Sequence, residues 1–135
     1  MSALDEFTFE DLLSHEDIYE QTVHSTLQKL LDEEGLIFAA RLASIILTPT
    51  EVDFQHIALN RLAASSNDDI QRQAVRVMTE FLARDNYDFQ LTAIAAGGLL
   101  KPTVRKEFLP LVVQFEQSTD NDRLRKAAKA YIRES

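Results

Sequence analysis

Residues 65–84 read SSNDDIQRQAVRVMTEFLAR, and this stretch carries every signal of one amphipathic helix. Its first four residues are small and polar, as in a turn that also caps a helix N-terminus. After the turn, apolar residues recur at steps of three and four: Ile70, Ala74, Val77, Met78, Phe81 and Leu82. This spacing places them on one face of an α-helix. The stretch therefore predicts a helix over about Asp69–Arg84 with one buried side.

The same helical period recurs on both sides of this stretch, and no alternation of period two indicates a strand. The further predicted helices cover about Asp5–Leu13, Tyr19–Glu34, Leu36–Leu47, Thr50–Ala64, Tyr87–Ala96, Thr103–Glu116 and Asp122–Glu134. Leu36–Leu47 is apolar nearly all round, and Tyr87–Ala96 is rich in alanine, so we expect both to be buried. The sequence predicts an all-α fold of about eight helices, with residues 1–135 forming a single domain.

Composition excludes several classes of protein. The chain of 135 residues has no Cys, which rules out disulfides, thiolate catalysis and Cys-ligated zinc. Its N-terminus is acidic and lacks the features of a signal peptide. The longest nearly apolar stretch, Leu36–Leu47, is twelve residues long, too short to span a bilayer. We therefore expect a cytoplasmic protein that does not enter a membrane.

Two segments of the chain look alike at an offset of 54 residues: Asn67–Ala74 and Asn121–Ala128. Each has a capping Asn-Asp, a branched apolar residue, a base two positions later, and an alanine that we expect to be tightly packed. Each also follows an apolar helix. This pattern resembles the HEAT repeat, although the offset exceeds the ~40–47 residues of such repeats. The resemblance implies an irregular HEAT-like stack of helices, and a plain helix bundle is the alternative.

No combination of residues forms recognisable catalytic or cofactor-binding machinery. Glu20 and His24, and likewise Asp53 and His56, could each share a metal, but neither pair has an evident third ligand. The pair Gly97-Gly98 is more simply a helix stop than a phosphate-binding loop. We therefore expect a protein that is not an enzyme and has neither a metal nor another cofactor.

Charge is distributed very unevenly along the chain. Residues 1–34 hold ten acidic residues and one basic residue, Lys29, whereas the other 101 residues hold 12 acidic and 13 basic ones. The acidic segment repels nucleic acid and anionic lipid and attracts basic proteins. The basic residues in the rest of the chain alternate with acidic ones, which indicates a mixed surface with internal ion pairs. These basic residues include Arg72, Arg76, Lys101, Arg105, Lys106, Arg123, Arg125, Lys126 and Lys129.

The acidic residues Asp32, Glu33 and Glu34 form the best candidate for a binding site. They end a predicted helix, where the helix dipole is negative and further negative charge is unfavourable by a few tenths of a kcal/mol each. Helix stability therefore does not explain them. The other candidate contact residues are Glu16, Glu20, Asp5, Glu6, Glu10 and Asp11.

In size, charge and helical class, the chain is similar to the bacterial immunity proteins that neutralise basic nuclease toxins. This resemblance implies an acidic inhibitor whose carboxylates fill the phosphate-binding cleft of a basic partner. The alternative is a HEAT-like scaffold or adaptor that binds a peptide or helix in its groove. An enzyme or a DNA-binding repeat protein fits the sequence less well than either.

Overall fold

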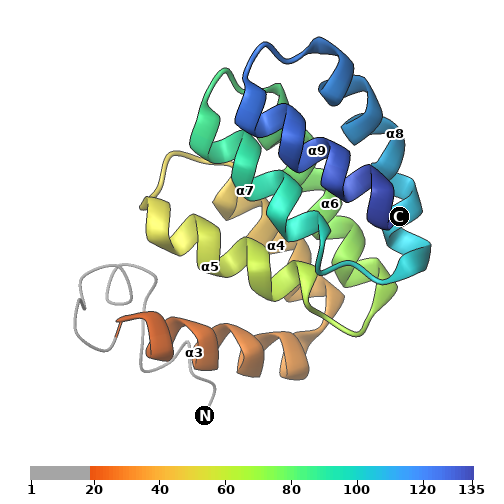
Figure 1. Ribbon diagram of the computed structural model, residues 1–135. Helices are drawn as coiled ribbons and strands as arrows, with labels where there is room; N and C mark the ends of the chain where they lie inside the picture. The colour runs from red at the N-terminus through yellow and green to blue at the C-terminus, as the bar shows by residue number, and fades with distance from the viewer. Residues whose placement is uncertain (1–18) are drawn as a thin grey trace.

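The computed structural model describes residues 19–135, and this part of the chain contains seven α-helices and no strand (Figure 1). The helices are α3 (Tyr19–Glu34), α4 (Leu36–Ile46), α5 (Val52–Ala63), α6 (Asp68–Ala83), α7 (Tyr87–Gly97), α8 (Pro102–Ser118) and α9 (Asp122–Glu134). The all-α prediction is confirmed for these residues. The predicted helix over Asp5–Leu13 lies outside them, so the predicted number of about eight helices is matched only in part.

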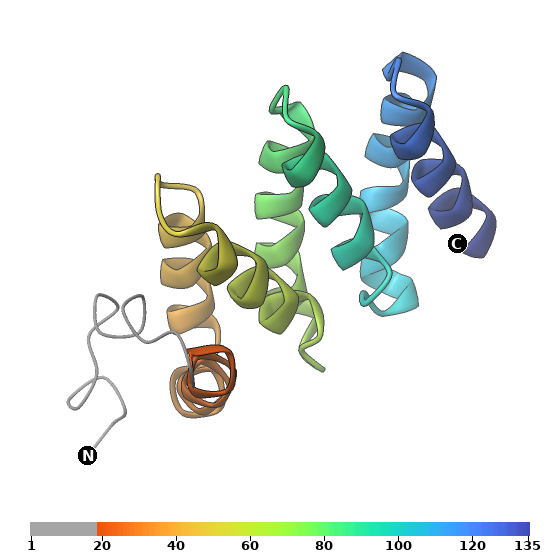
Figure 2. The same cartoon turned by 60° about the vertical axis from the view of Figure 1, so that its left-hand side comes forward.

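The helices are arranged in two layers. Helices α4, α6 and α8 lie side by side in one layer, and α5, α7 and α9 lie side by side in the other (Figure 2). Each helix of the first layer also packs on the helix that follows it in the chain. Helix α3 packs on both α4 and α5. The described residues thus form a stack of three helix pairs, α4–α5, α6–α7 and α8–α9, with α3 at one end.

The second layer contains an internal repeat that sequence reasoning missed. The N-cap residues of α5, α7 and α9 are Glu51, Asn86 and Asn121, which follow one another at intervals of 35 residues. The tripeptide Asp-Phe-Gln recurs at the same interval, at 53–55 and 88–90. So do three fully buried alanines, Ala58, Ala93 and Ala128. One helix pair of the stack therefore corresponds to 35 residues.

The offset of 54 residues relates two helices that are not equivalent, because α6 belongs to the first layer and α9 to the second. It is therefore not the period of the stack. Ala74 and Ala128 are nevertheless both fully buried, as expected from their place in the matched segments. The likeness to HEAT repeats stays a prediction, and the observed period is shorter than the ~40–47 residues of that family.

Four of the helix junctions are closed by the same pair of hydrogen bonds. The N-cap side chain accepts from the backbone N–H three residues later, and the residue four positions after the cap donates its side-chain N–H to a carbonyl that ends the preceding helix. The latter bonds run from Gln55 to Ile46 (2.8 Å), Gln71 to Ala63 (2.8 Å), Gln90 to Arg84 (2.7 Å) and Arg125 to Thr119 (2.6 Å). They satisfy donors and acceptors that helix ends leave without partners.

The expectation that Leu36–Leu47 is buried on all sides is wrong for one face of α4. The helix buries Phe38, Leu42 and Ile46, but Ile37 is 69% exposed and Leu36 is 44% exposed. The reason is its position at the edge of its layer, where α3, α5 and α6 cover only part of its circumference. In α7 the alanine-rich segment is buried at Ala93, Ile94 and Ala96 and exposed at Ala95.

Gly97 has a packing role in addition to its place at the end of α7. A Cβ atom on this residue would lie 2.7 Å from Cε2 of Tyr131 and 3.3 Å from the ring of Phe108. Gly98 follows with φ −66°, so the chain does not leave the helix through a left-handed residue here. The absence of a side chain at Gly97 therefore lets α7 approach α8 and α9 closely.

Tyr131 should make the protein less stable in alkaline solution. Burial raises the pKa of its phenol to about 12, although the charge of Arg105 acts in the opposite direction. The fold therefore favours the neutral phenol, whose stabilising contribution is complete below the unfolded pKa of ~10 and is lost as the pH rises toward 12. We expect Tyr131→Phe to lose less unfolding free energy than the wild type between pH 10 and 12, measured by urea unfolding. Equal losses in the two proteins would contradict this assignment.

Candidate functional site

The first candidate surface is formed where α3 meets α4, and we call it the acidic corner: Asp32, Glu33, Glu34, Leu36 and Ile37. Gly35 separates the two helices with φ 60°, a left-handed conformation that suits glycine. Because the connection is a single residue, the acidic last turn of α3 lies directly beside the first turn of α4. Asp32 and Glu33 are exposed, Glu34 is half-buried, and both apolar residues are exposed.

Within the described residues, none of the three carboxylates of the acidic corner forms an ion pair. Asp32 accepts one hydrogen bond, from the side-chain amide of Gln28 at 3.0 Å. The last turn of α3 contains no basic residue. The acidic corner therefore combines uncompensated negative charge with two exposed apolar side chains.

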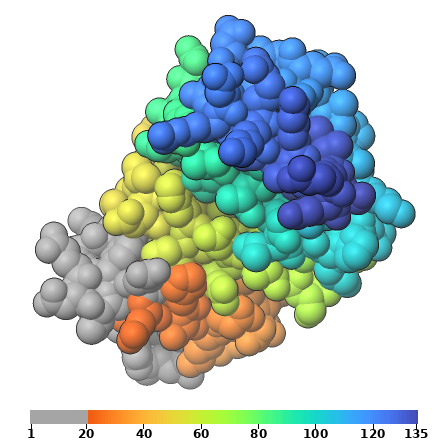
Figure 3. Space-filling model, in the orientation of Figure 1, coloured from red at the N-terminus to blue at the C-terminus, as the bar shows by residue number. Residues whose placement is uncertain are grey.

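The structure separates the other predicted contact residues from this corner. Glu20 lies in the first turn of α3, and at 1.5 Å per residue its backbone is roughly 20 Å from that of Glu34. The remaining predicted contact residues, Asp5, Glu6, Glu10, Asp11 and Glu16, lie outside the described residues. Helix α3 itself lies at the end of the molecule opposite to α9 (Figure 3).

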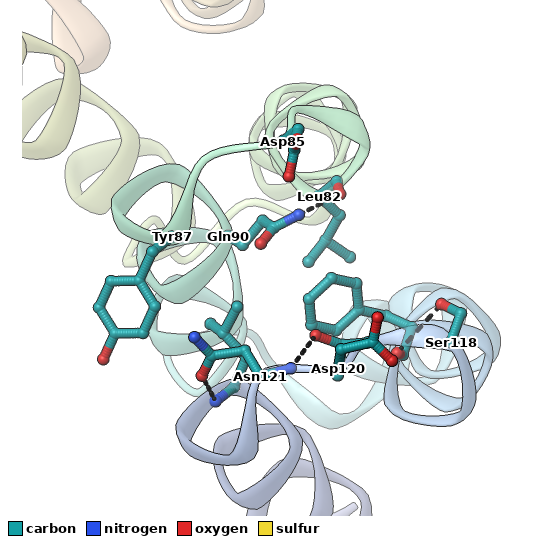
Figure 4. A pocket seen from close by; sticks show the side chains of 10 residues that line it. Leu82, Asp85, Tyr87, Gln90, Ser118, Asp120 and Asn121 are labelled. Carbon is teal, nitrogen blue, oxygen red and sulfur yellow. Dashed lines mark hydrogen bonds between the residues drawn. The ribbon is translucent and has the colours of Figure 1, made fainter.

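A second candidate surface lies where α6 and α8 end and α7 and α9 begin. It contains a cavity of about 450 Å³ with mostly polar walls (Figure 4). The cavity is lined by Leu82, Asp85, Tyr87, Gln90, Phe115, Ser118, Thr119, Asp120, Asn121 and Leu124. Sequence reasoning did not find this site.

Most polar side chains of this cavity are already bonded to the backbone. Gln90 donates to the carbonyls of Leu82 and Arg84, Ser118 donates to that of Phe115, and Asn121 accepts from the N–H of Leu124. Asp85 and Asp120 differ, because they are exposed and form no ion pair or hydrogen bond with the described residues. No basic residue lines the cavity. The polar groups left for a ligand are therefore chiefly acidic.

An apolar slot of about 310 Å³ adjoins this cavity, between α6 and α8. It is lined by Thr79, Leu82, Ala83, Leu111, Gln114, Phe115 and Ser118. Leu82, Phe115 and Ser118 line both the slot and the cavity, so the two are neighbours. We call the cavity and the slot together the loop-edge groove.

The base nearest to the loop-edge groove in sequence is engaged elsewhere. The guanidinium group of Arg84 lies 4.8 Å from the ring centre of Phe81 and 4.6 Å from that of Phe89. It also donates to the carbonyl of Leu47 at 3.3 Å. Arg84 is thus held by α4, α6 and α7 and does not neutralise Asp85.

Ion pairs occupy many of the basic residues after Asn67, as predicted for a mixed surface. The pairs are Arg72–Asp69, Arg72–Glu107, Lys101–Asp68, Arg105–Glu134, Arg125–Asp122 and Lys129–Glu116. The hydrogen bond from Lys101 lowers the pKa of the Asp68 carboxyl, and the carboxylate of Glu107 raises the pKa of Arg72 above its ordinary value. These residues do not form a continuous surface of free positive charge.

The histidines do not gather metal ligands. His56 lies in α5, and its Nε2 is 3.2 Å from the hydroxyl of Thr92 in α7. From residue 19 onward, no group of three or more His, Cys, Asp or Glu side chains could hold a metal ion. In the same part of the chain, no helix is long and apolar enough to cross a bilayer.

Comparison with known proteins found no matching family model, no similar curated protein and no solved structure with a matching fold. The two resemblances drawn from the sequence stay predictions. The argument for function therefore depends on the two candidate surfaces.

Proposed function

We propose that the protein is a non-catalytic binding module that neutralises a basic protein, such as a nuclease toxin, through the acidic corner. The observation that supports this proposal is the position of three carboxylates without ion pairs beside two exposed apolar residues, Leu36 and Ile37. Charge alone would serve solubility, but exposed isoleucine has no such use. Carboxylates around an apolar contact are what a basic partner with an apolar centre would bind.

The two kinds of side chain would act on different steps of binding. Uncompensated charge accelerates the encounter with an oppositely charged partner and makes its rate depend on salt. Apolar surface removed from water stabilises the complex by about 25 cal/mol per Å² and so slows dissociation. In this proposal Asp32 and Glu33 steer the partner, while Ile37 anchors it.

A scaffold or adaptor that binds a peptide is the second candidate function. The loop-edge groove supports it, because the groove offers a cavity and an apolar slot away from the acidic corner. Either function is one of binding without catalysis.

The triple variant Asp32→Asn, Glu33→Gln, Glu34→Gln should slow association with the partner about tenfold or more at low salt. Its association rate should also depend less on salt, because the charges that steer the encounter are gone. The partner is first captured at low ionic strength and identified, and rates are then measured by surface plasmon resonance. The variant should remain as stable as the wild type or become slightly more stable, since it removes charge from the negative end of α3.

A matched control is the variant Asp53→Asn, Glu80→Gln, Asp88→Asn, which removes the same charge from three exposed positions outside the acidic corner. It should change the association rate by less than about threefold. Separately, Ile37→Ser should speed dissociation and leave association nearly unchanged. If the first triple variant binds at the wild-type rate, the acidic corner only aids solubility and the proposal is wrong.

A further inference from the structure

We infer that the loop-edge groove binds an extended peptide segment of a partner protein in which a Lys or Arg neighbours a large apolar residue. This site is separate from the acidic corner and does not depend on the function proposed for that corner. The groove combines two adjacent chemistries, a carboxylate cavity and an apolar slot, which meet at Leu82 and Phe115.

The cavity suits the cationic side chain. Asp85 and Asp120 precede the N-caps of α7 and α9, and both carboxylates lie at the cavity from separate loops (Figure 4). Helices α6 and α8 end at the same place, so the negative ends of two helix dipoles also favour a cation there. Tyr87 adds an aromatic ring, which attracts a cation over its face.

The slot suits the apolar side chain. Its walls include Leu82, Ala83, Leu111 and Phe115, and its only other lining residues are uncharged. With volumes of about 450 and 310 Å³, the two parts lie within the range of ~300–1,000 Å³ typical of ligand sites. A side chain in the slot would hold its neighbour beside the carboxylates.

Other occupants fit the groove less well. Two exposed carboxylates are too few to hold a metal ion on their own. Nucleic acid and anionic lipid would be repelled, since no basic residue lines either part. A basic and apolar peptide matches both the charge and the apolar wall.

The repeat explains how this site arises. Asp85 and Asp120 are 35 residues apart, the interval that also separates the N-caps Asn86 and Asn121. Equivalent loops of two neighbouring helix pairs therefore present equivalent carboxylates to the space between them. Asp120 thus repeats the role of Asp85 one helix pair further along.

The test is an NMR titration of the ¹⁵N-labelled protein with the synthetic hexapeptide Ac-Gly-Ser-Arg-Phe-Ser-Gly-NH₂ and with its Phe-Arg counterpart. We expect shifts at amides of residues 79–90 and 111–124. A peptide with Glu in place of Arg, or Ser in place of Phe, should bind at least about fivefold more weakly. Shifts centred on the acidic corner, or equal binding of the Glu peptide, would overturn the inference.

Variants of the protein complete the test. Asp85→Asn with Asp120→Asn should weaken binding of the Arg-Phe peptide about fivefold, and Ala83→Phe, which fills the slot, should abolish its shifts. Asp88→Asn is the matched control, because this exposed acid of α7 lines neither part of the groove. The acidic-corner triple variant should bind the peptide like the wild type, so that failure of one site leaves the other intact. Wild-type binding by the Asp85/Asp120 variant would refute the groove.

Discussion

Replacing Gln71 with leucine is expected to lower the free energy of unfolding by about 2–4 kcal/mol. Gln71 is only 1% exposed, and its amide nitrogen donates to the carbonyls of Ala63 and Ser65, both at 2.8 Å. Its amide oxygen accepts from the backbone N–H of Lys101 at 3.0 Å. Leucine has a similar size but no polar atoms, so three backbone groups would lose their partner. The change is measured by urea unfolding.

The matched control is Gln73→Leu, in the same helix and only half-buried. Its side chain accepts one exposed hydrogen bond, from Arg76 at 3.3 Å. This variant should change the unfolding free energy by no more than about 0.5 kcal/mol. If both variants lose the same stability, the cost comes from the leucine and not from the three backbone bonds.

The role of Gln71 goes beyond its own helix. It joins the α5–α6 junction to the start of α8, because Ala63 and Lys101 belong to different helix pairs of the stack. Gln55 and Gln90 make the corresponding bond at their own junctions. These polar bonds fix how successive helices meet, whereas the apolar core mainly holds the layers together.

The sequence was sufficient to predict the helices, because the signals that start and stop a helix are local. For α6 the predicted range was Asp69–Arg84 and the observed range is Asp68–Ala83. Asn67 and Asn121 cap their helices as the sequence indicated, each accepting from the N–H three residues later. The periodic apolar residues of α6 are also buried, from Ile70 to Phe81.

The exposure of Ile37 could not be predicted from α4, since burial depends on which helices surround it. An apolar helix at the edge of a layer leaves one side to solvent or to a partner. The alternative register was also hard to reject from the sequence. Asn67 and Asn121 cap helices of different layers with the same chemistry, so local similarity gave an offset of 54 residues.

The loop-edge groove was missed for the same reason. Its two carboxylates, Asp85 and Asp120, become equivalent only when the interval of 35 residues is recognised. The repeated tripeptide Asp-Phe-Gln at 53–55 and 88–90 was the available signal for it. Of the acidic corner, the sequence predicted the carboxylates but not the exposed apolar residues beside them.

Gly97→Ala is expected to lower the free energy of unfolding by about 1–3 kcal/mol. Alanine normally stabilises a helix relative to glycine, by about 0.4–1 kcal/mol, but here its Cβ would lie 2.7 Å from Cε2 of Tyr131. The tyrosine ring cannot move aside cheaply. Its hydroxyl donates to the carbonyl of Arg105 at 3.0 Å, and its edge packs against Phe108 with ring centres 5.8 Å apart.

The neighbouring glycine separates the effect of crowding from the effect of removing a glycine. Gly98 is exposed, its φ of −66° suits any residue, and an added Cβ would meet only the carbonyl of Ala95, at 3.3 Å. Gly98→Ala should therefore leave stability unchanged or raise it by up to about 1 kcal/mol. Urea unfolding of the two variants should give opposite signs or a clear gap. Equal stabilities would mean that α7 can shift away from α9, and that the close approach at Gly97 is not what holds the last helix pair in place.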